Sequence, residues 1–213
     1  MRFKNRIFAG QMLAEALKKY NHDPEAVVIG LPRGGVVPAY EIAHQLGLPL
    51  DIIIVRKIGA PFEPELAVGA LSEDGIILFN DDVLDMLRLT REDMRDAVAQ
   101  KLEEASKRRI LFRAGKEPID LHGKTVIIVD DGVATGATLR VAIKTAKKRG
   151  AHRIVVALPV APTEFKSQIA SEVDEAIILS ESDFFPGVGY FYDVFQQVED
   201  QEVLHLLHIS HSL

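Results

Sequence analysis

The sequence contains no cysteine. This excludes a disulfide framework, a thiol nucleophile and a cysteine-ligated zinc site. No apolar run approaches the roughly 20 residues that a membrane-spanning helix needs. The first twenty residues carry charges throughout and lack the apolar core of about 7 to 15 residues that marks a signal peptide. We therefore expect a cytoplasmic protein with no membrane partner.

An excess of basic residues is also missing. The formal net charge is -6 and the sequence pI is about 5.7, whereas a dedicated nucleic-acid-binding protein carries a basic surface. Nucleic acid is therefore not an expected partner. A length of 213 residues suits one large α/β domain with a substantial core, and we expect residues 1–213 to form a single domain.

Two common nucleotide-binding motifs are absent. The chain contains no G-x-G-x-x-G sequence. Only three residues separate Gly132 from Gly136, and Ala137 stands where the lysine of a nucleotide-triphosphate P-loop would be. Neither a dinucleotide nor a nucleoside triphosphate is the predicted ligand.

The most informative stretch is residues 125–150, which predicts a strand, a loop and a helix in direct succession. Residues 126–129 are an uninterrupted β-branched run, typical of a strand buried on both faces of a parallel sheet. Asp130 and Asp131 follow where the carboxyl end of that strand should open into a crevice. A helix should start near Ala137 and end at Gly150, after a basic last turn.

The loop before this helix predicts a phosphate site. Thr135 and Gly136 precede the helix start, where backbone N–H groups have no partner within the helix, and Thr135 and Thr138 add hydroxyl donors. Two carboxylates beside a cradle for one phosphate group suit a phosphorylated sugar. The alternative is an ordinary strand-to-helix turn in which the two aspartates act as helix caps.

Residues 126–138, VIIVDDGVATGAT, resemble the signature of the type I phosphoribosyltransferases. The resemblance implies an α/β, Rossmann-like fold in which helices flank both faces of a parallel sheet. It also implies Mg²⁺-dependent transfer of 5-phosphoribosyl from 5-phosphoribosyl-1-pyrophosphate (PRPP) to a nitrogenous acceptor such as a nucleobase, with a role in nucleotide salvage, and a homodimer. By the same resemblance, Asp130 and Asp131 hold the ribose hydroxyls and contact the metal indirectly. The 5-phosphate would be bound by Ala134, Thr135, Gly136, Ala137 and Thr138.

A second strand, glycine loop and helix occur near the N-terminus. We expect a strand over residues 26–29, a loop over 30–35 and a helix over 37–45 that is closed by Gly47. The resemblance implies that Arg33, Gly34 and Gly35 bind pyrophosphate. A tight turn without a ligand is the alternative.

The next predicted strand, residues 50–55, ends at Arg56 and Lys57. The resemblance places Lys57 on the pyrophosphate and a mobile loop at residues 59–65, which closes over the site. A solvated pair of cations and a simple loop are the alternatives. Residues 67–71 and 76–79 should form a hairpin at the sheet edge.

Residues 80–115 are predicted to be a helical insertion. A short helix should start at Asn80, whose neighbouring acids act as caps, and a capping box at residues 90–93 should start a long helix. After the signature, we expect a strand over 153–158, a helix over 163–173 and a last parallel strand over 175–179.

The C-terminal segment, residues 181–213, is expected to form a hood or tail. Aromatic residues gather in residues 183–195, and their flat faces suit stacking on an acceptor base, for which Phe185, Tyr190 and Tyr192 are the candidates. The alternative is a core beneath an irregular tail. The spacing of His205, His208 and His211 does not keep all three on one helix face, which argues against a metal site there.

One position departs from the family pattern. Family members that act on hypoxanthine and guanine carry a third acid where this chain has Ala134, so an adenine-like, pyrimidine-like or other amine acceptor is favoured. Two other functions stay open from the sequence. A regulator could bind PRPP without turnover, and a sugar-phosphate hydrolase would require a nucleophile or metal cluster that the sequence does not show.

Overall fold

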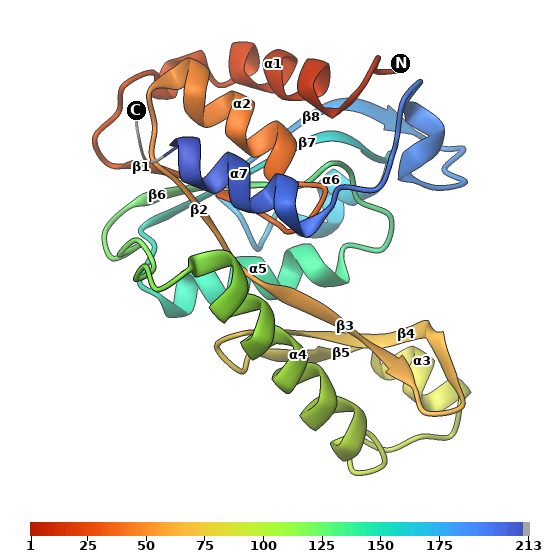
Figure 1. The fold of residues 1–213 in the computed structure, drawn as a ribbon. Coiled ribbons are helices and arrows are strands. Elements are labelled where there is room, and N and C mark those ends of the chain that lie inside the picture. Colours follow the sequence, from red (N-terminus) through yellow and green to blue (C-terminus); the bar gives the residue numbers. More distant parts are fainter. Residues whose placement is uncertain (211–213) are drawn as a thin grey trace.

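The computed structural model describes residues 1–210, and of Glu65 the backbone alone (Figure 1). Its main sheet has five parallel strands in the order β2-β1-β6-β7-β8. The strands of this sheet are β1 (Ala26–Gly30), β2 (Leu50–Ile52), β6 (Thr125–Val129), β7 (Arg153–Pro162) and β8 (Glu175–Ser182). The parallel α/β sheet expected from the sequence is confirmed.

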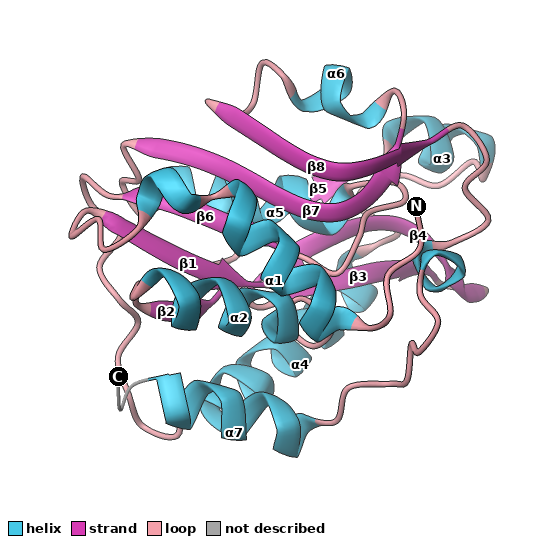
Figure 2. Cartoon of the chain, turned by 90° about the horizontal axis from the view of Figure 1, so that it is seen from above, coloured by secondary structure: helices cyan, strands magenta, loops and turns pink. Residues whose placement is uncertain are grey.

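Helices cover both faces of this sheet (Figures 1 and 2). Val28 and Ile127 pack in a cluster with α1, α2 and α7, whereas Val27 and Ile128, which point to the opposite face, pack with α5 and α6. The helices are α1 (Arg6–Ala16), α2 (Val36–Leu46), α5 (Ala137–Lys148), α6 (Phe165–Ile169) and α7 (Asp200–Ser210), with 3₁₀ turns at Lys18–Tyr20 and Val188–Phe191. No helix in residues 1–210 is long and apolar enough to cross a lipid bilayer.

The register of β1 against β6 fixes the place of the two predicted loops. Gly30, the last residue of β1, pairs with Val129, the last residue of β6. The loops that follow these strands therefore start side by side at the carboxyl edge of the sheet, which is where open α/β folds bind ligands.

A second, antiparallel sheet differs from the expected edge hairpin. Its strands are β3 (Val55–Ala60), β4 (Glu63–Ser72) and β5 (Ile77–Phe79), and it extends away from the main sheet (Figure 1). The strand expected over residues 50–55 was wrong in extent, because β2 ends at Ile52 and the chain then enters β3. Arg56 and Lys57 consequently lie within a strand. The apolar run through residues 52–55 is unbroken, so no residue in it marks the change of sheet.

Smaller corrections concern the helices and one loop. The expected loop over residues 59–65 is reduced to a turn at residues 61–62, because its remaining residues belong to the paired strands β3 and β4. The short helix α3 (Asp81–Met86) forms where it was expected, but its cap is the Asn80 side chain, and the acids that were expected to cap it, Asp81 and Asp82, lie in its first turn. Thr90 and Asp93 exchange the capping hydrogen bonds, but α4 (Arg95–Arg113) begins only after them. The helix expected over residues 163–173 is reduced to α6.

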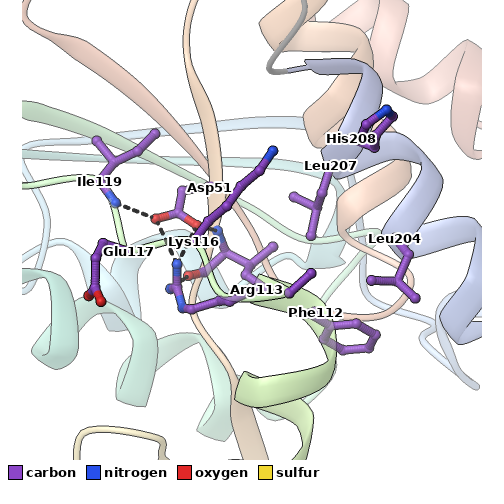
Figure 3. Close-up of a pocket in the computed structure, with 11 residues that line it drawn as sticks. Asp51, Phe112, Arg113, Lys116, Glu117, Ile119, Leu204, Leu207 and His208 are labelled. Atoms are coloured by element: carbon purple, nitrogen blue, oxygen red, sulfur yellow. Dashed lines mark hydrogen bonds and ion pairs between the residues drawn. The ribbon is translucent and has the colours of Figure 1, made fainter.

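A buried ion pair joins α4 to the main sheet beside a cavity of about 80 Å³ (Figure 3). Arg113, at the end of α4, donates from Nη1 to Asp51 Oδ1 at 3.0 Å and from Nη2 to the carbonyl of Ile52 at 3.1 Å. The backbone N–H of Ile119 donates to the second Asp51 oxygen at 2.8 Å. Both charged side chains are more than nine-tenths buried. This pair fixes α4 at the point where the chain leaves β2.

Glu73 extends the network to α5. Its side chain is 1% exposed and accepts from Arg149 Nη2 at 3.0 Å, while Arg113 Nη2 lies 3.6 Å away. Arg149 also donates to Asp74 at 2.6 Å. The turn between β4 and β5 is thereby fixed to the last turn of α5. Glu73 Oε2 has no hydrogen-bond partner in the described chain, which is costly for a buried carboxylate.

We predict that Glu73→Gln lowers the free energy of unfolding by roughly 1.5–3 kcal/mol, because it removes the anion shared by Arg113 and Arg149, each of which keeps one other carboxylate partner. Urea unfolding followed by circular dichroism measures this. Glu103→Gln is the control, since its ion pair with Lys107 is exposed and should change stability by less than about 1 kcal/mol. Equal losses for both variants would contradict the assigned role of Glu73.

Candidate functional site

The acid pair lies at the carboxyl edge of the sheet, directly after β6. The Asp130 carboxylate accepts a hydrogen bond from the backbone N–H of Asp131 at 2.9 Å. The Asp131 carboxylate accepts from Arg6 Nε at 2.6 Å, and these two side chains are 14% and 11% exposed. The two aspartates therefore lie in a largely desolvated position, and Arg6 is a cation that contacts Asp131 directly.

Arg6 joins three segments of the chain. Besides contacting Asp131, it donates from Nη1 to the carbonyl of Gln196 at 2.7 Å, and its guanidinium lies 3.8 Å from the centre of the Phe195 ring. The hydroxyl of Tyr192 donates to the backbone carbonyl of Asp131 at 2.6 Å. The start of α1 and the C-terminal segment thus hold the acid pair together.

Burial and mutual repulsion set the ionisation of the pair. Burial raises the pKa of Asp130 well above its usual range, and the neighbouring charge of Asp131 raises it further. Burial also raises the pKa of Asp131, although the Arg6 guanidinium lowers this pKa and opposes the effect. The ammonium of Lys57, an exposed residue on β3, lowers the pKa of Asp130, as the Arg6 guanidinium also does. A ligand that donates hydrogen bonds or brings a cation would stabilise the ionised pair.

The glycine loop after β1 packs directly against the acids. A Cβ atom on Gly34 would overlap the Asp131 carboxylate, and one on Gly35 would lie 2.8 Å from Asp130 Cα. Since real Cβ atoms do not approach so closely, only glycine permits this contact between the two loops. The backbone next to Arg33 therefore reaches the acid pair without an intervening side chain.

The two loops and the C-terminal segment line an open cavity of about 410 Å³. The cavity has the volume of a small-molecule site, and it contains two guanidinium groups and one carboxylate. Its lining residues are Arg6, Arg33, Gly34, Asp131, Phe195, Gln196, Gln197 and Val198.

The loop after the acid pair presents free hydrogen-bond donors. In the chain from residue 1 to 210, the backbone N–H groups of residues 134–139 donate no hydrogen bond. Ala134 and Thr135 are exposed, Ala137 and Thr138 are less accessible, and Gly136 takes a left-handed conformation with φ of 76° that starts α5. This is the arrangement of an anion site at a helix N-terminus.

The predicted aromatic residues divide between surface and core. Tyr190 is 54% exposed and packs edge-on against Phe184 and Phe191. Phe185 is partly buried against Phe191, with ring centres 4.9 Å apart. Tyr192 is 3% exposed and packs on Phe3, so its ring has no open face for a base and its hydroxyl supports the acid pair instead.

Sequence reasoning missed Arg6, and although it expected a hood from residues 181–213, it named none of residues 195–198 as site candidates. Arg6 lies 125 positions from Asp131 and belongs to no motif, so no local pattern could have identified it. Arg33 was predicted as a site residue, and it lines the cavity. Its Nη1 also lies 3.7 Å from Asp200 Oδ1. Arg108, on α4, lies 3.3 Å from the same carboxylate oxygen, and it too was missed.

A histidine metal site is not formed by the described residues. Among residues 1–210, no group of three or more His, Cys, Asp or Glu side chains is placed to hold a metal ion. His205 and His208 lie on α7, and His211 lies outside the described residues.

Comparisons of the chain with protein-family models and with known proteins agree on one family. The model of the phosphoribosyl transferase domain matches residues 5–189. Rv0571c of Mycobacterium tuberculosis, a protein provisionally named as a phosphoribosyl transferase, is 43% identical over 210 residues, which are 98% of this chain and 47% of that protein. The chain thus spans about half the length of this curated relative.

Two further matches differ in how much of this chain they cover. The crystal structure of TT1426 from Thermus thermophilus superposes with a TM-score of 0.80 at 38% identity, covering 97% of this chain and 98% of that one. A uracil phosphoribosyltransferase of Paenarthrobacter aurescens is 36% identical over 91 residues, which are 38% of this chain and 43% of that protein.

We predict that Arg6→Met raises the pKa of Asp131 further, because burial then acts without the opposing guanidinium charge. Carboxyl-carbon chemical shifts of aspartate, followed by NMR as the pH is lowered, measure this. Arg2→Met is the control, since Arg2 forms an exposed ion pair with Asp193 and should leave the titration of Asp131 unchanged. An unchanged titration in Arg6→Met would contradict the assigned charge coupling.

Proposed function

This chain belongs to the phosphoribosyl transferase family, and we propose that it transfers the 5-phosphoribosyl group of PRPP to a nitrogen atom of a nucleobase in a Mg²⁺-dependent reaction. In this transfer the bond between ribose C1 and the pyrophosphate oxygen breaks, and a bond between C1 and the acceptor nitrogen forms. Pyrophosphate leaves with the bonding electron pair, and the acceptor nitrogen loses its proton.

One arrangement carries the proposal. The backbone N–H groups of residues 134–139 directly follow the acid pair along the chain and donate to no described residue, and Gly34, beside Arg33, packs directly against Asp131. A sugar with a phosphate at one end and a pyrophosphate at the other matches this order of donors, acceptors and cation. An ordinary helix cap would not require the second loop to contact the acids.

The proposed roles follow from the chemistry of each group. Asp130 and Asp131 accept hydrogen bonds from the ribose hydroxyls and stabilise the positive charge that develops on the ring. Residues 134–138 bind the 5-phosphate, so that binding energy remote from C1 orients the reacting carbon. Arg33, Gly34, Gly35 and Lys57 bind the pyrophosphate and offset its charge as it leaves.

The residues present fit a magnesium ion. Mg²⁺ prefers oxygen ligands, and it is usually held by one or two carboxylates together with substrate phosphates and water. Asp130 and Asp131 supply two adjacent carboxylates, and burial raises the pKa of both, so a cation beside them would favour their ionised form. When bound, Mg²⁺ would neutralise part of the charge on the leaving pyrophosphate.

The identity of the acceptor is part of the proposal. Ala134 replaces the third acid of the relatives that act on 6-oxopurines, and one relative over part of the chain is named for uracil. We therefore favour a pyrimidine or adenine-like base. Of the three aromatic residues predicted from the sequence, Phe185 and Tyr190 remain candidates to contact it, since Tyr192 is buried.

We predict that the purified protein with PRPP and Mg²⁺ releases pyrophosphate when a suitable base is added. A coupled pyrophosphate assay over a panel containing uracil, cytosine, adenine, hypoxanthine and guanine measures this. The Asp130→Asn/Asp131→Asn variant should lose about a hundredfold or more in kcat/KM, because the charge that stabilises the transition state is removed.

The matched control is Asp82→Asn/Asp85→Asn, which removes the same charge from exposed positions on α3 and should leave kcat/KM unchanged. Saturable PRPP binding without pyrophosphate release for any base would favour a PRPP-binding regulator. Absence of PRPP binding would refute both functions.

A further inference from the structure

Two arginine side chains from different elements meet on one carboxylate at the start of α7. Arg33, from the loop after β1, lies 3.7 Å through Nη1 from Asp200 Oδ1, and Arg108 of α4 lies 3.3 Å through Nη1 from the same oxygen. Glu199 is 4.0 Å from Arg33. Neither arginine is fully buried, with side chains 27% and 24% exposed. Asp200 therefore holds together two cations that would otherwise repel each other.

A third cation lies nearby. Arg56 of β3 pairs with Glu104, one helical turn before Arg108 on α4, at 2.9 Å. Burial lowers the pKa of Arg108, and the charges of Arg56 and Arg33 lower it further. Arg108 thus feels the charges of two other guanidinium groups, which its contact with Asp200 offsets, so an additional anion beside Arg33 and Arg108 would be stabilised.

This cluster is continuous with the proposed donor site. Arg33 lines the 410 Å³ cavity together with Gly34 and Asp131, and Val198 of the same cavity wall lies two residues before Asp200. Any anion that takes both hydrogen-bonding edges of Arg33 must therefore compete with Asp200. The competition is feasible, because a partly exposed ion pair contributes little net stability.

We propose that Arg108, a residue of the inserted helix α4, is an additional ligand for the pyrophosphate end of the donor, and that Asp200 is a resident counter-ion which the pyrophosphate displaces. This inference rests on the proposed function and goes beyond it, because it assigns a binding role to the insertion and a competing role to α7. The bound pyrophosphate would take the place of the Asp200 carboxylate between Arg33 and Arg108.

A purely tethering role for these contacts makes a different prediction. If Arg108 and Asp200 only hold α7 in place, removing either one loosens the same contact and changes ligand binding in the same direction. If Asp200 competes with the ligand, the two substitutions have opposite effects. The signs of the two effects therefore separate the hypotheses.

The experiment is isothermal titration of the full chain with inorganic pyrophosphate and, separately, with PRPP, both with Mg²⁺. We expect Asp200→Asn to bind pyrophosphate about three- to tenfold more tightly and Arg108→Gln to bind it more weakly by a similar factor. In the double variant, the gain from Asp200→Asn should shrink, since its partner is gone.

Matched controls remove the same charges nearby. Glu202→Gln changes an exposed acid of α7, and Arg109→Gln changes an exposed base of α4; both should bind pyrophosphate as the unmodified protein does. Thermal melting of each variant separates loss of fold from loss of binding.

Each outcome has one meaning. Opposite shifts for Asp200→Asn and Arg108→Gln support the proposal, as does pyrophosphate binding that appears only in Asp200→Asn. Shifts in the same direction, or shifts no larger than those of the controls, overturn it and leave the proposed function intact if PRPP still binds. Absence of binding by every protein, with either ligand, overturns both.

Discussion

The site depends on the charge balance of two adjacent carboxylates in a desolvated position. Asp130 and Asp131 follow a strand that is buried on both faces, so their backbone cannot move toward solvent without disturbing β6. Repulsion between them is offset by Arg6, which approaches from α1. Because Arg6 also contacts the C-terminal segment through Gln196, the charge balance of the acids and the closure of the cavity are coupled. A change in one is expected to change the other.

The second requirement is close approach of the backbone. β1 and β6 end at paired residues, so the loops that follow them start side by side. Contact between those loops requires that Gly34 and Gly35 lack side chains. One loop supplies N–H donors at the start of α5, and the other supplies Arg33. The sheet therefore sets the spacing of the two loops, and under the proposed function the glycines would allow a single ligand to span them.

The sequence predicted the local units well, because each carries its own signals. The strand, acids and helix of residues 125–150 and the closing Gly47 were found where the structure has them. Features set by long-range contacts were missed. The apolar run at residues 52–55 does not show that the chain changes sheets there, and no local pattern links Arg6 to Asp131 or Arg108 to Asp200.

The ion pairs that α4 makes differ in burial. A buried pair can hold the helix in place, whereas a partly exposed pair can exchange its carboxylate for a ligand. At its base, Asp51 and Arg113 are more than nine-tenths buried, and breaking such a pair leaves a charge without solvent or partner. Beside Arg33, Asp200 is 38% exposed, so water can solvate it in the displacement that we propose. The same α4 helix can therefore stay fixed at Arg113 while Arg108, little more than one turn earlier, exchanges its partner.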